Sequence, residues 1–111
     1  HPSLSTNSSY ADAKKLLKGN GGMVSFTLKD ESEHALKKFY DREFSSIIKA
    51  PSIGSNLTLI CPYTLLTNYF YTDEELKEIN LPRYLIRISA GCETETERIL
   101  EDLDFALKRT I

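Results

Sequence analysis

The sequence is poor in the residues that mark a disulfide scaffold, a zinc centre or a nucleic-acid-binding surface. Its two cysteines, Cys61 and Cys92, are too few for a disulfide framework and too isolated for a zinc site. They suit the reducing cytoplasm, where we expect this protein. Fourteen lysines and arginines stand against sixteen aspartates and glutamates, which gives a formal net charge of -2. That balance provides no broad basic surface, so we expect no nucleic-acid partner.

Charged residues are missing from one long stretch, Ala50 to Thr72, which has the length of a membrane span of about 20 residues. Prolines, a glycine and several serines, threonines and asparagines interrupt this stretch, and such polar groups are costly in lipid. We therefore expect it inside a folded domain, with no membrane association. The 111 residues, 41% hydrophobic and 27% charged, suffice for one ordinary globular domain.

Apolar residues at helical spacing predict four helices. They are expected over residues 10–17, from residue 31 to about 47, over 73–81 and over 95–109. Two capping boxes support the later pair: Thr72 with Glu75 before the brief acidic helix, and Thr94 with Glu97 before the last helix.

Alternating apolar residues predict strands over 24–28 and 84–89, and the short apolar run at 57–60 also predicts a strand. In the last strand, Ile86 and Ile88 point to one face of the sheet, and Arg87 and Ser89 point to the other. This element order predicts an α+β fold, a small mostly antiparallel sheet covered by helices on one face. A sheet with one bare face often packs on another domain, so we expect a part of a larger protein.

No catalytic or metal-binding constellation is evident. The histidines, His1 and His34, have no nucleophile arrangement around them, and His34 is expected to be solvated. The carboxylates between residues 93 and 104 are expected to form a solvated helix face. The glycines at 19, 21 and 22 lack the spacing of a phosphate loop and predict a turn.

Two features are candidates for binding an anion. Arg87 lies in an otherwise apolar strand, where its fork of donors would match a carboxylate. The alternative is an arginine on the solvent face of an antiparallel strand. The backbone N–H groups of the loop at 52–55 could hold an anion, or the loop could be an ordinary turn. Spacing alone leaves both alternatives open.

Three segments in this order resemble a known family. They are Gly-Gly-Met-Val-Ser-Phe at 21–26, Ala-Pro-Ser-Ile-Gly at 50–54, and Leu-Ile-Arg-Ile-Ser-Ala-Gly at 85–91 followed by Glu93. With the opening His-Pro-Ser-Leu, they look like the C-terminal domain of the cystathionine γ-synthase family. These are pyridoxal-phosphate-dependent enzymes of cysteine and methionine metabolism with the aspartate-aminotransferase-like fold (fold type I). The likeness runs from the first residue to the closing helix.

The resemblance implies roles for two residues. Arg87 matches the arginine that binds the α-carboxylate of the amino-acid substrate. Ser52 matches the serine of a Ser-Leu-Gly-Gly loop whose main chain helps to hold that carboxylate. No residue of this chain is expected to be catalytic, to bind the cofactor or to bind a metal.

The resemblance also implies that residues 1–111 are the C-terminal domain of a larger enzyme. Its large N-terminal domain, absent from this chain, would bind pyridoxal 5′-phosphate and pack against these residues, and the whole enzyme would be a homo-oligomer, as in the tetramers of the family. No lysine here follows the family's Ser-x-Thr motif. The Schiff-base lysine is therefore expected elsewhere, and the 111-residue chain alone is expected to be inactive.

Departures from the family pattern concern the expected substrate channel. Pro51 stands where the family usually has glutamate, Ser55 replaces the second glycine, and segment 62–68 lacks the family's histidine. They indicate a divergent synthase-like branch, and the expected reaction is γ-replacement on an O-acylhomoserine by cysteine. The alternative is a free-standing α+β module that binds an amino acid or a partner without catalysis. An exposed apolar docking surface would favour the enzyme domain.

Overall fold

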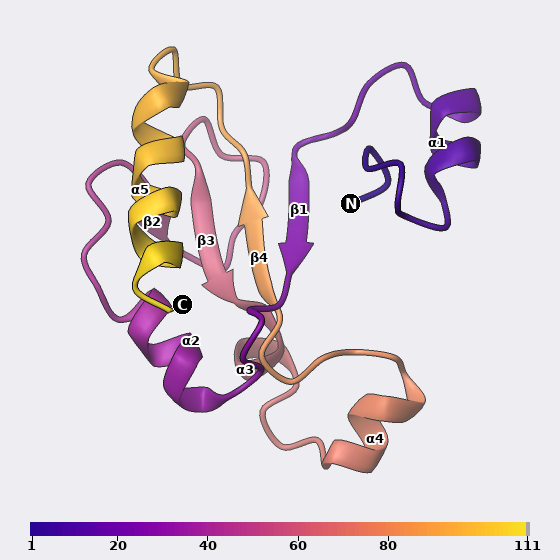
Figure 1. The fold of residues 1–111 in the computed structure, drawn as a ribbon, viewed down its shortest axis with the longest axis vertical. Coiled ribbons are helices and arrows are strands. Elements are labelled where there is room, and N and C mark those ends of the chain that lie inside the picture. Colours follow the sequence, from indigo (N-terminus) through magenta and orange to yellow (C-terminus); the bar gives the residue numbers. More distant parts are fainter. Residues whose placement is uncertain (111) are drawn as a thin grey trace.

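A four-stranded sheet with the order β1-β4-β3-β2 organises the computed structural model, which describes residues 1–110 (Figure 1). The edge strand β1 (Met23–Phe26) and the inner strand β3 (Leu59–Pro62) both pair antiparallel with β4 (Ile86–Ser89). The short β2 (Ile48–Lys49) pairs parallel with β3. The predicted α+β fold with a mostly antiparallel sheet is thus confirmed.

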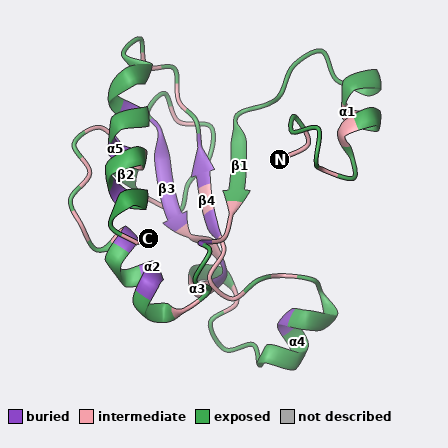
Figure 2. Ribbon diagram, viewed as in Figure 1, coloured by how far each residue is buried: buried purple, intermediate pink, exposed green. Residues whose placement is uncertain are grey.

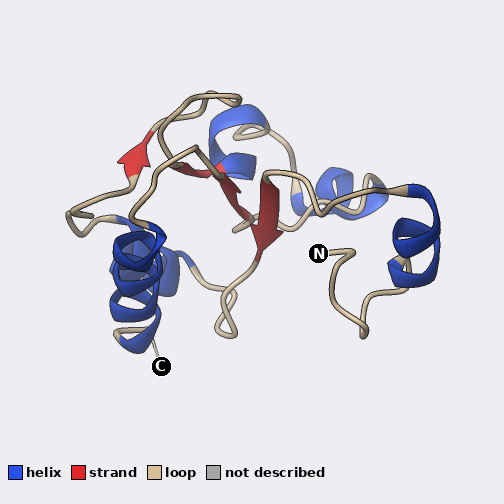
Figure 3. Cartoon of the chain, turned by 90° about the horizontal axis from the view of Figure 1, so that it is seen from above, coloured by secondary structure: helices blue, strands red, loops and turns tan. Residues whose placement is uncertain are grey.

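Two helices, α2 (Glu33–Tyr40) and α5 (Thr96–Lys108), lie together on one side of the strands (Figure 3). Apolar residues of both helices and alternate residues of β3 and β4 form the core. Its buried members include Leu36, Phe39, Ile60, Ile86, Ile88, Ile99 and Ala106. Figure 2 shows this burial concentrated in β3 and β4, whereas the edge strand β1 is mostly exposed.

The predicted helix from residue 31 to about 47 is too long. The helix α2 ends at Tyr40, with Asp41 as its C-cap, and the chain continues irregularly to β2. The apolar stripe nevertheless continues, because Phe44 and Ile47 pack on the same core from outside the helix. The ring centroids of Phe39 and Phe44 lie 6.0 Å apart. Periodicity alone could not separate helical residues from a loop that crosses the same core.

One predicted capping box is present and the other is not. Thr72 and Glu75 exchange backbone and side-chain hydrogen bonds of 2.7 and 3.2 Å at the start of α4 (Asp73–Glu78). The box of Thr94 with Glu97 is wrong, because α5 begins at Thr96 and has no side-chain cap. The preceding residues are held elsewhere: the N–H of Cys92 donates to the carbonyl of Asn56 at 2.7 Å.

Two parts of the chain extend away from the sheet (Figure 1). One is an N-terminal arm with α1 (Tyr10–Leu16), and the other carries α4. The strand predicted over 84–89 is confirmed only from Ile86, and the strand predicted over 57–60 lies two residues later. The helical turn α3 (Tyr63–Thr67), directly after β3, was not predicted. Nowhere in residues 1–110 is a helix both long enough and apolar enough to span a bilayer.

Candidate functional site

Arg87 lies on the face of the sheet opposite α2 and α5. Its neighbours in the strand, Ile86 and Ile88, are buried in the core, so the pleat turns Arg87 to the other face, as predicted. Its cross-strand partners are Ser25 of β1 and Cys61 of β3. The helical turn α3 covers this region and places the Tyr63 ring centroid 5.0 Å from the guanidinium carbon.

The structure brings the two predicted site residues, Arg87 and Ser52, into direct contact. The Nη2 group of Arg87 donates to the carbonyl oxygens of Pro51 and Ser52, the latter at 3.3 Å. Gly54 in the same loop has a φ of 72°, the left-handed conformation that glycine adopts freely. Its N–H lies 3.4 Å from the hydroxyl of Ser89, which is buried in β4. The loop at 51–55 thus lies along β4.

The guanidinium of Arg87 retains donor capacity. Its Nε is buried and has no hydrogen-bond partner within the described part of the chain. A buried donor without an acceptor is costly, by about 1–3 kcal/mol. An acceptor with two oxygens, such as a carboxylate, would satisfy it. Arg87 is half-buried, so its guanidinium is partly enclosed by the loop and by α3 and partly open to solvent.

Cys61 does not provide a negative charge beside Arg87. Burial raises the pKa of the Cys61 thiol, and the nearby guanidinium only partly opposes this rise. The thiol is therefore neutral near pH 7. The groups around the guanidinium are two carbonyls, an aromatic ring and this thiol. Among these described groups the guanidinium alone is cationic, and none of its neighbours is a lysine.

A second set of contacts, which the sequence did not reveal, ties Thr58 to residues 91–93, which follow β4. Thr58 ends the segment 51–58 between β2 and β3, which contains Ser52 and is called the Ser52 loop below. The carboxylate of Glu93 accepts from the backbone N–H of Thr58 and, at 2.8 Å, from its hydroxyl. The N–H of Gly91 donates to the same hydroxyl oxygen at 3.0 Å. The bond from the Thr58 N–H lowers the pKa of Glu93. Only the placement of Glu93 in the family-like segment at 85–93 hinted at this role.

Asp102 corrects the prediction of a solvated helix face over residues 93–104. It is 5% exposed and accepts four hydrogen bonds. The donors are the N–H and hydroxyl of Ser45 and the N–H groups of Ser46 and Ile47. Burial alone would raise the pKa of Asp102, but these bonds together lower it. Glu93 is the second exception, since it precedes α5 and binds Thr58.

An apolar groove of about 350 Å³ opens beside α5, over β1 and the end of β4. Its apolar lining residues include Val24, Phe26, Ile88, Ile99, Leu103 and Leu107. Val24 is 38% exposed although it lies on the helix side of the sheet, opposite Ile88. The molecule thus has an exposed apolar surface on the helix side of the sheet, beside the edge strand β1.

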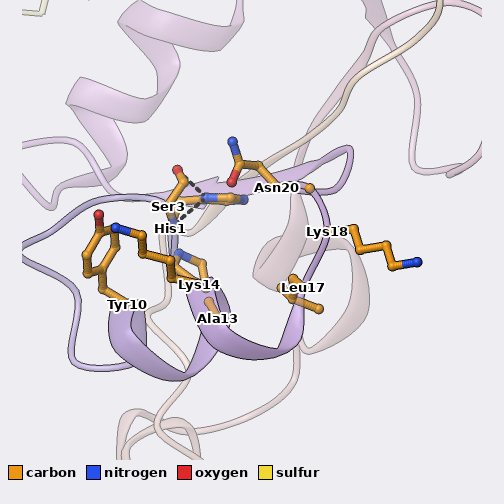
Figure 4. Close-up of a pocket in the computed structure, with 10 residues that line it drawn as sticks. His1, Ser3, Tyr10, Ala13, Lys14, Leu17, Lys18 and Asn20 are labelled. Carbon is orange, nitrogen blue, oxygen red and sulfur yellow. Dashed lines mark hydrogen bonds between the residues drawn. The ribbon is translucent and has the colours of Figure 1, made fainter.

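A separate hollow of about 360 Å³ lies on the N-terminal arm (Figure 4). Residues from the first twenty line it, among them Tyr10 and Lys14, and His1 bonds Ser3 at 2.8 Å there. Neither Arg87 nor Ser52 contributes to it. His34 is exposed on α2, and within residues 1–110 no three His, Cys, Asp or Glu side chains gather as a metal site would need.

Comparisons with known proteins give matches along almost the whole chain. The family profile described as "Cys/Met metabolism PLP-dependent enzyme" matches residues 1–108. L-methionine gamma-lyase of Fusobacterium nucleatum is 34% identical over 98% of this chain and 27% of its own length. Cystathionine gamma-synthase of Neurospora crassa is 36% identical over 89% of this chain and 15% of its own length.

Solved structures of the same family have the same fold as this chain. Cystathionine gamma synthase of Xanthomonas oryzae pv. oryzae, in complex with cystathionine, superposes with a TM-score of 0.85 at 32% identity. The match covers 98% of this chain and 27% of that protein. The chain therefore spans less than a third of the length of these relatives. Its fold is that of a domain of fold type I enzymes, and the chain belongs to the family of pyridoxal-phosphate-dependent enzymes of cysteine and methionine metabolism.

Proposed function

We propose that residues 1–111 are the C-terminal, substrate-carboxylate-binding domain of a cystathionine γ-synthase-like enzyme. In this proposal, Arg87 pairs with the α-carboxylate of the amino-acid substrate, and the main chain of the Ser52 loop lies beside it. The observation that carries the proposal is the guanidinium of Arg87, whose Nε is buried on the face opposite the core helices and finds no acceptor among residues 1–110.

The role of Arg87 is binding and orientation. A guanidinium holds a carboxylate through two parallel hydrogen bonds, which fixes the rotation of the substrate as well as its position. Because Nη2 is already held by the carbonyls of Pro51 and Ser52, the guanidinium cannot swing away when the substrate leaves. Such preorganisation lowers the cost of binding. The Tyr63 ring centroid lies 5.0 Å from the guanidinium carbon, a cation–π contact that adds to this hold.

Pyridoxal phosphate, when bound by the rest of the enzyme, supplies the electron sink for carbanion chemistry. A fixed carboxylate fixes the Cα–H bond of the same substrate, so this domain contributes by orientation and not by proton transfer. The proposed reaction is γ-replacement on an O-acylhomoserine by cysteine. Its support is the presence of cystathionine gamma-synthases among the relatives of this chain.

We further infer that a large N-terminal domain packs against this chain and that the enzyme is a homo-oligomer. The apolar groove beside α5 supports such packing, since an apolar surface of this kind needs cover. The relatives are three or more times as long as the region that matches, which leaves room for that domain.

Steady-state kinetics of the full-length enzyme test the proposal. Arg87→Ala should raise KM for the O-acylhomoserine by about 10- to 100-fold while cofactor absorbance stays unchanged. Arg42→Ala is the matched control, because Arg42 also has a buried, unpartnered guanidinium nitrogen but lies 4.3 Å from the Phe105 ring in the helix layer. An unchanged KM in Arg87→Ala, or an equal rise in Arg42→Ala, would refute the assignment.

A further inference from the structure

We propose that Glu93 is a positioning residue for the carboxylate site. It fixes the end of the Ser52 loop to the end of β4, so that the loop carbonyls meet the guanidinium of Arg87. The inference rests on the proposed function, since it concerns the same site. Glu93 itself has no hydrogen bond to Arg87, so any effect on the substrate must pass through the loop.

The connection starts at Thr58, the last residue before β3. Thr58 is 3% exposed, and both its N–H and its hydroxyl donate to the Glu93 carboxylate. The hydroxyl oxygen also accepts from the N–H of Gly91. The carboxylate, the hydroxyl and the backbone therefore form a closed ring of hydrogen bonds, which holds Thr58 in one place. The lowered pKa of Glu93 keeps the carboxylate ionised at neutral pH.

The loop and the end of β4 also approach closely at Gly91. A Cβ on Gly91 would lie 2.5 Å from the carbonyl carbon of Leu57 and 2.7 Å from the Glu93 carboxylate, distances that side chains do not tolerate. The N–H of Cys92 donates to the carbonyl of Asn56 at 2.7 Å in the same region. Residues 56–58 are thus held by backbone contact in addition to the Glu93 carboxylate.

The proposed carboxylate site lies at the other end of the loop, at residues 51–54. Gly54 contacts the Ser89 hydroxyl, and the carbonyls of Pro51 and Ser52 accept from Arg87. Ser89 and Arg87 belong to the same strand, β4, that leads to Gly91 and Glu93. Release of the loop at Thr58 would therefore let its carbonyls move, and the guanidinium of Arg87 would lose the two acceptors that hold it in place.

The experiment measures KM and kcat of the full-length enzyme with Glu93→Ala and Glu93→Gln. Glu93→Ala should raise KM about tenfold with kcat within about threefold, since a misplaced binding group loses orientation. Glu93→Gln, which keeps one acceptor oxygen, should recover most of this loss. Glu97→Ala is the control, because Glu97 is exposed in the first turn of α5. Calorimetry should compare the binding of a substrate analogue that has the carboxylate with the binding of the amine that lacks it. Glu93→Ala should weaken binding of the carboxylate analogue only.

A double variant distinguishes this inference from the proposed function. In an Arg87→Ala background, Glu93→Ala should raise KM by less than about twofold, because residues that act as a unit are not additive. Three outcomes overturn the role of Glu93 even when Arg87→Ala behaves as proposed. They are additive effects of the two substitutions on KM, an unchanged KM in both Glu93 variants, and binding of the amine that weakens as much as binding of the carboxylate analogue. If Glu93→Ala does not fold, the KM of Glu93→Gln decides: a rise of about threefold supports the role, and no rise refutes it. An unchanged KM in Arg87→Ala itself refutes the proposed function.

Discussion

Glu93 and Asp102 are two carboxylates with similar structural roles in different parts of the molecule. Each accepts hydrogen bonds from the backbone and hydroxyl groups of a segment far away in the sequence. Asp102, on α5, holds residues 45–47, which lead from the core into β2. Glu93 holds Thr58, at the end of the loop that carries Ser52.

The difference lies in burial and in what each carboxylate supports. Asp102 is buried and satisfies four donors within the helix-covered layer. Glu93 is partly exposed and satisfies two donors of one residue. Loss of Asp102 would leave four donors unpaired beneath the helices, whereas loss of Glu93 would leave two donors of one residue unpaired at the end of the Ser52 loop. We therefore expect Asp102 to matter mainly for stability and Glu93 mainly for substrate binding.

The largest effect is expected from Asp102→Ala. Four donors lose their acceptor, and the free energy of unfolding should fall by about 3 kcal/mol. Urea denaturation of the full-length enzyme, with hydrogen exchange of the Ser46 and Ile47 amides, measures this. Asp104→Ala is the matched control, because within residues 1–110 Asp104 pairs only with exposed Lys108, at 2.5 Å, and its loss should cost less than about 0.5 kcal/mol. Equal effects of the two variants would contradict the comparison.

Gly91→Ala should have the next largest effect, and it should act on the contact between the Ser52 loop and residues 91–93. The added Cβ meets the backbone of residues 56–57, so the loop must move away from β4. We expect kcat/KM to fall by about 10- to 100-fold, with the change mainly in KM. Gly22→Ala serves as control, since its Cβ would lie an ordinary 3.6 Å from the Ala90 carbonyl. A normal KM in Gly91→Ala would show that the loop need not be held there.

Acid should weaken the Asp102 contact in a defined direction. The hydrogen bonds lower the pKa of folded Asp102 below the value of about 3.9 in the unfolded chain. The unfolded chain therefore takes up the proton first, so this stabilisation is complete above that value and is lost as the pH falls through the folded-state pKa. Unfolding of the parent and of Asp102→Asn, measured between pH 7 and 3, checks this. The parent should lose more stability than the variant, and parallel curves would contradict the prediction.

The smallest effect is expected from Ser89→Ala. Its hydroxyl lies 3.4 Å from the N–H of Gly54, a long contact to an exposed residue that water can satisfy. KM should change by less than about threefold, because the loop remains held by Glu93 and Arg87. Kinetics beside those of Glu93→Ala test this, and a larger effect for Ser89→Ala would reverse the order of importance along the loop.

Most secondary structure followed from local patterns, and the misses have physical causes. The alternation in 84–89 correctly placed Arg87 opposite the core, because the pleat has a fixed period of two. The second helix was predicted too long because Phe44 and Ile47 reach the core from a loop. The capping box at Thr94 failed because residues 91–93 are engaged by residues 56–58. The family of the chain was recognisable from three motifs.

The resemblance to a known family, and not the pattern of residues, paired Arg87 with the Ser52 loop. The sequence by itself determined the composition of the two layers, the face on which Arg87 lies, and Arg87 and the loop at 52–55 as two separate anion-binding candidates. These depend on periodicity and on side-chain chemistry, which are local properties. Only the tertiary structure decided that Asp102 is buried, that Glu93 binds Thr58 and that the Nε of Arg87 meets no acceptor in the part of the chain that the structure describes. These contacts join residues about 35 to 57 positions apart, and whether a carboxylate meets water or a backbone amide depends on which segments the fold brings together.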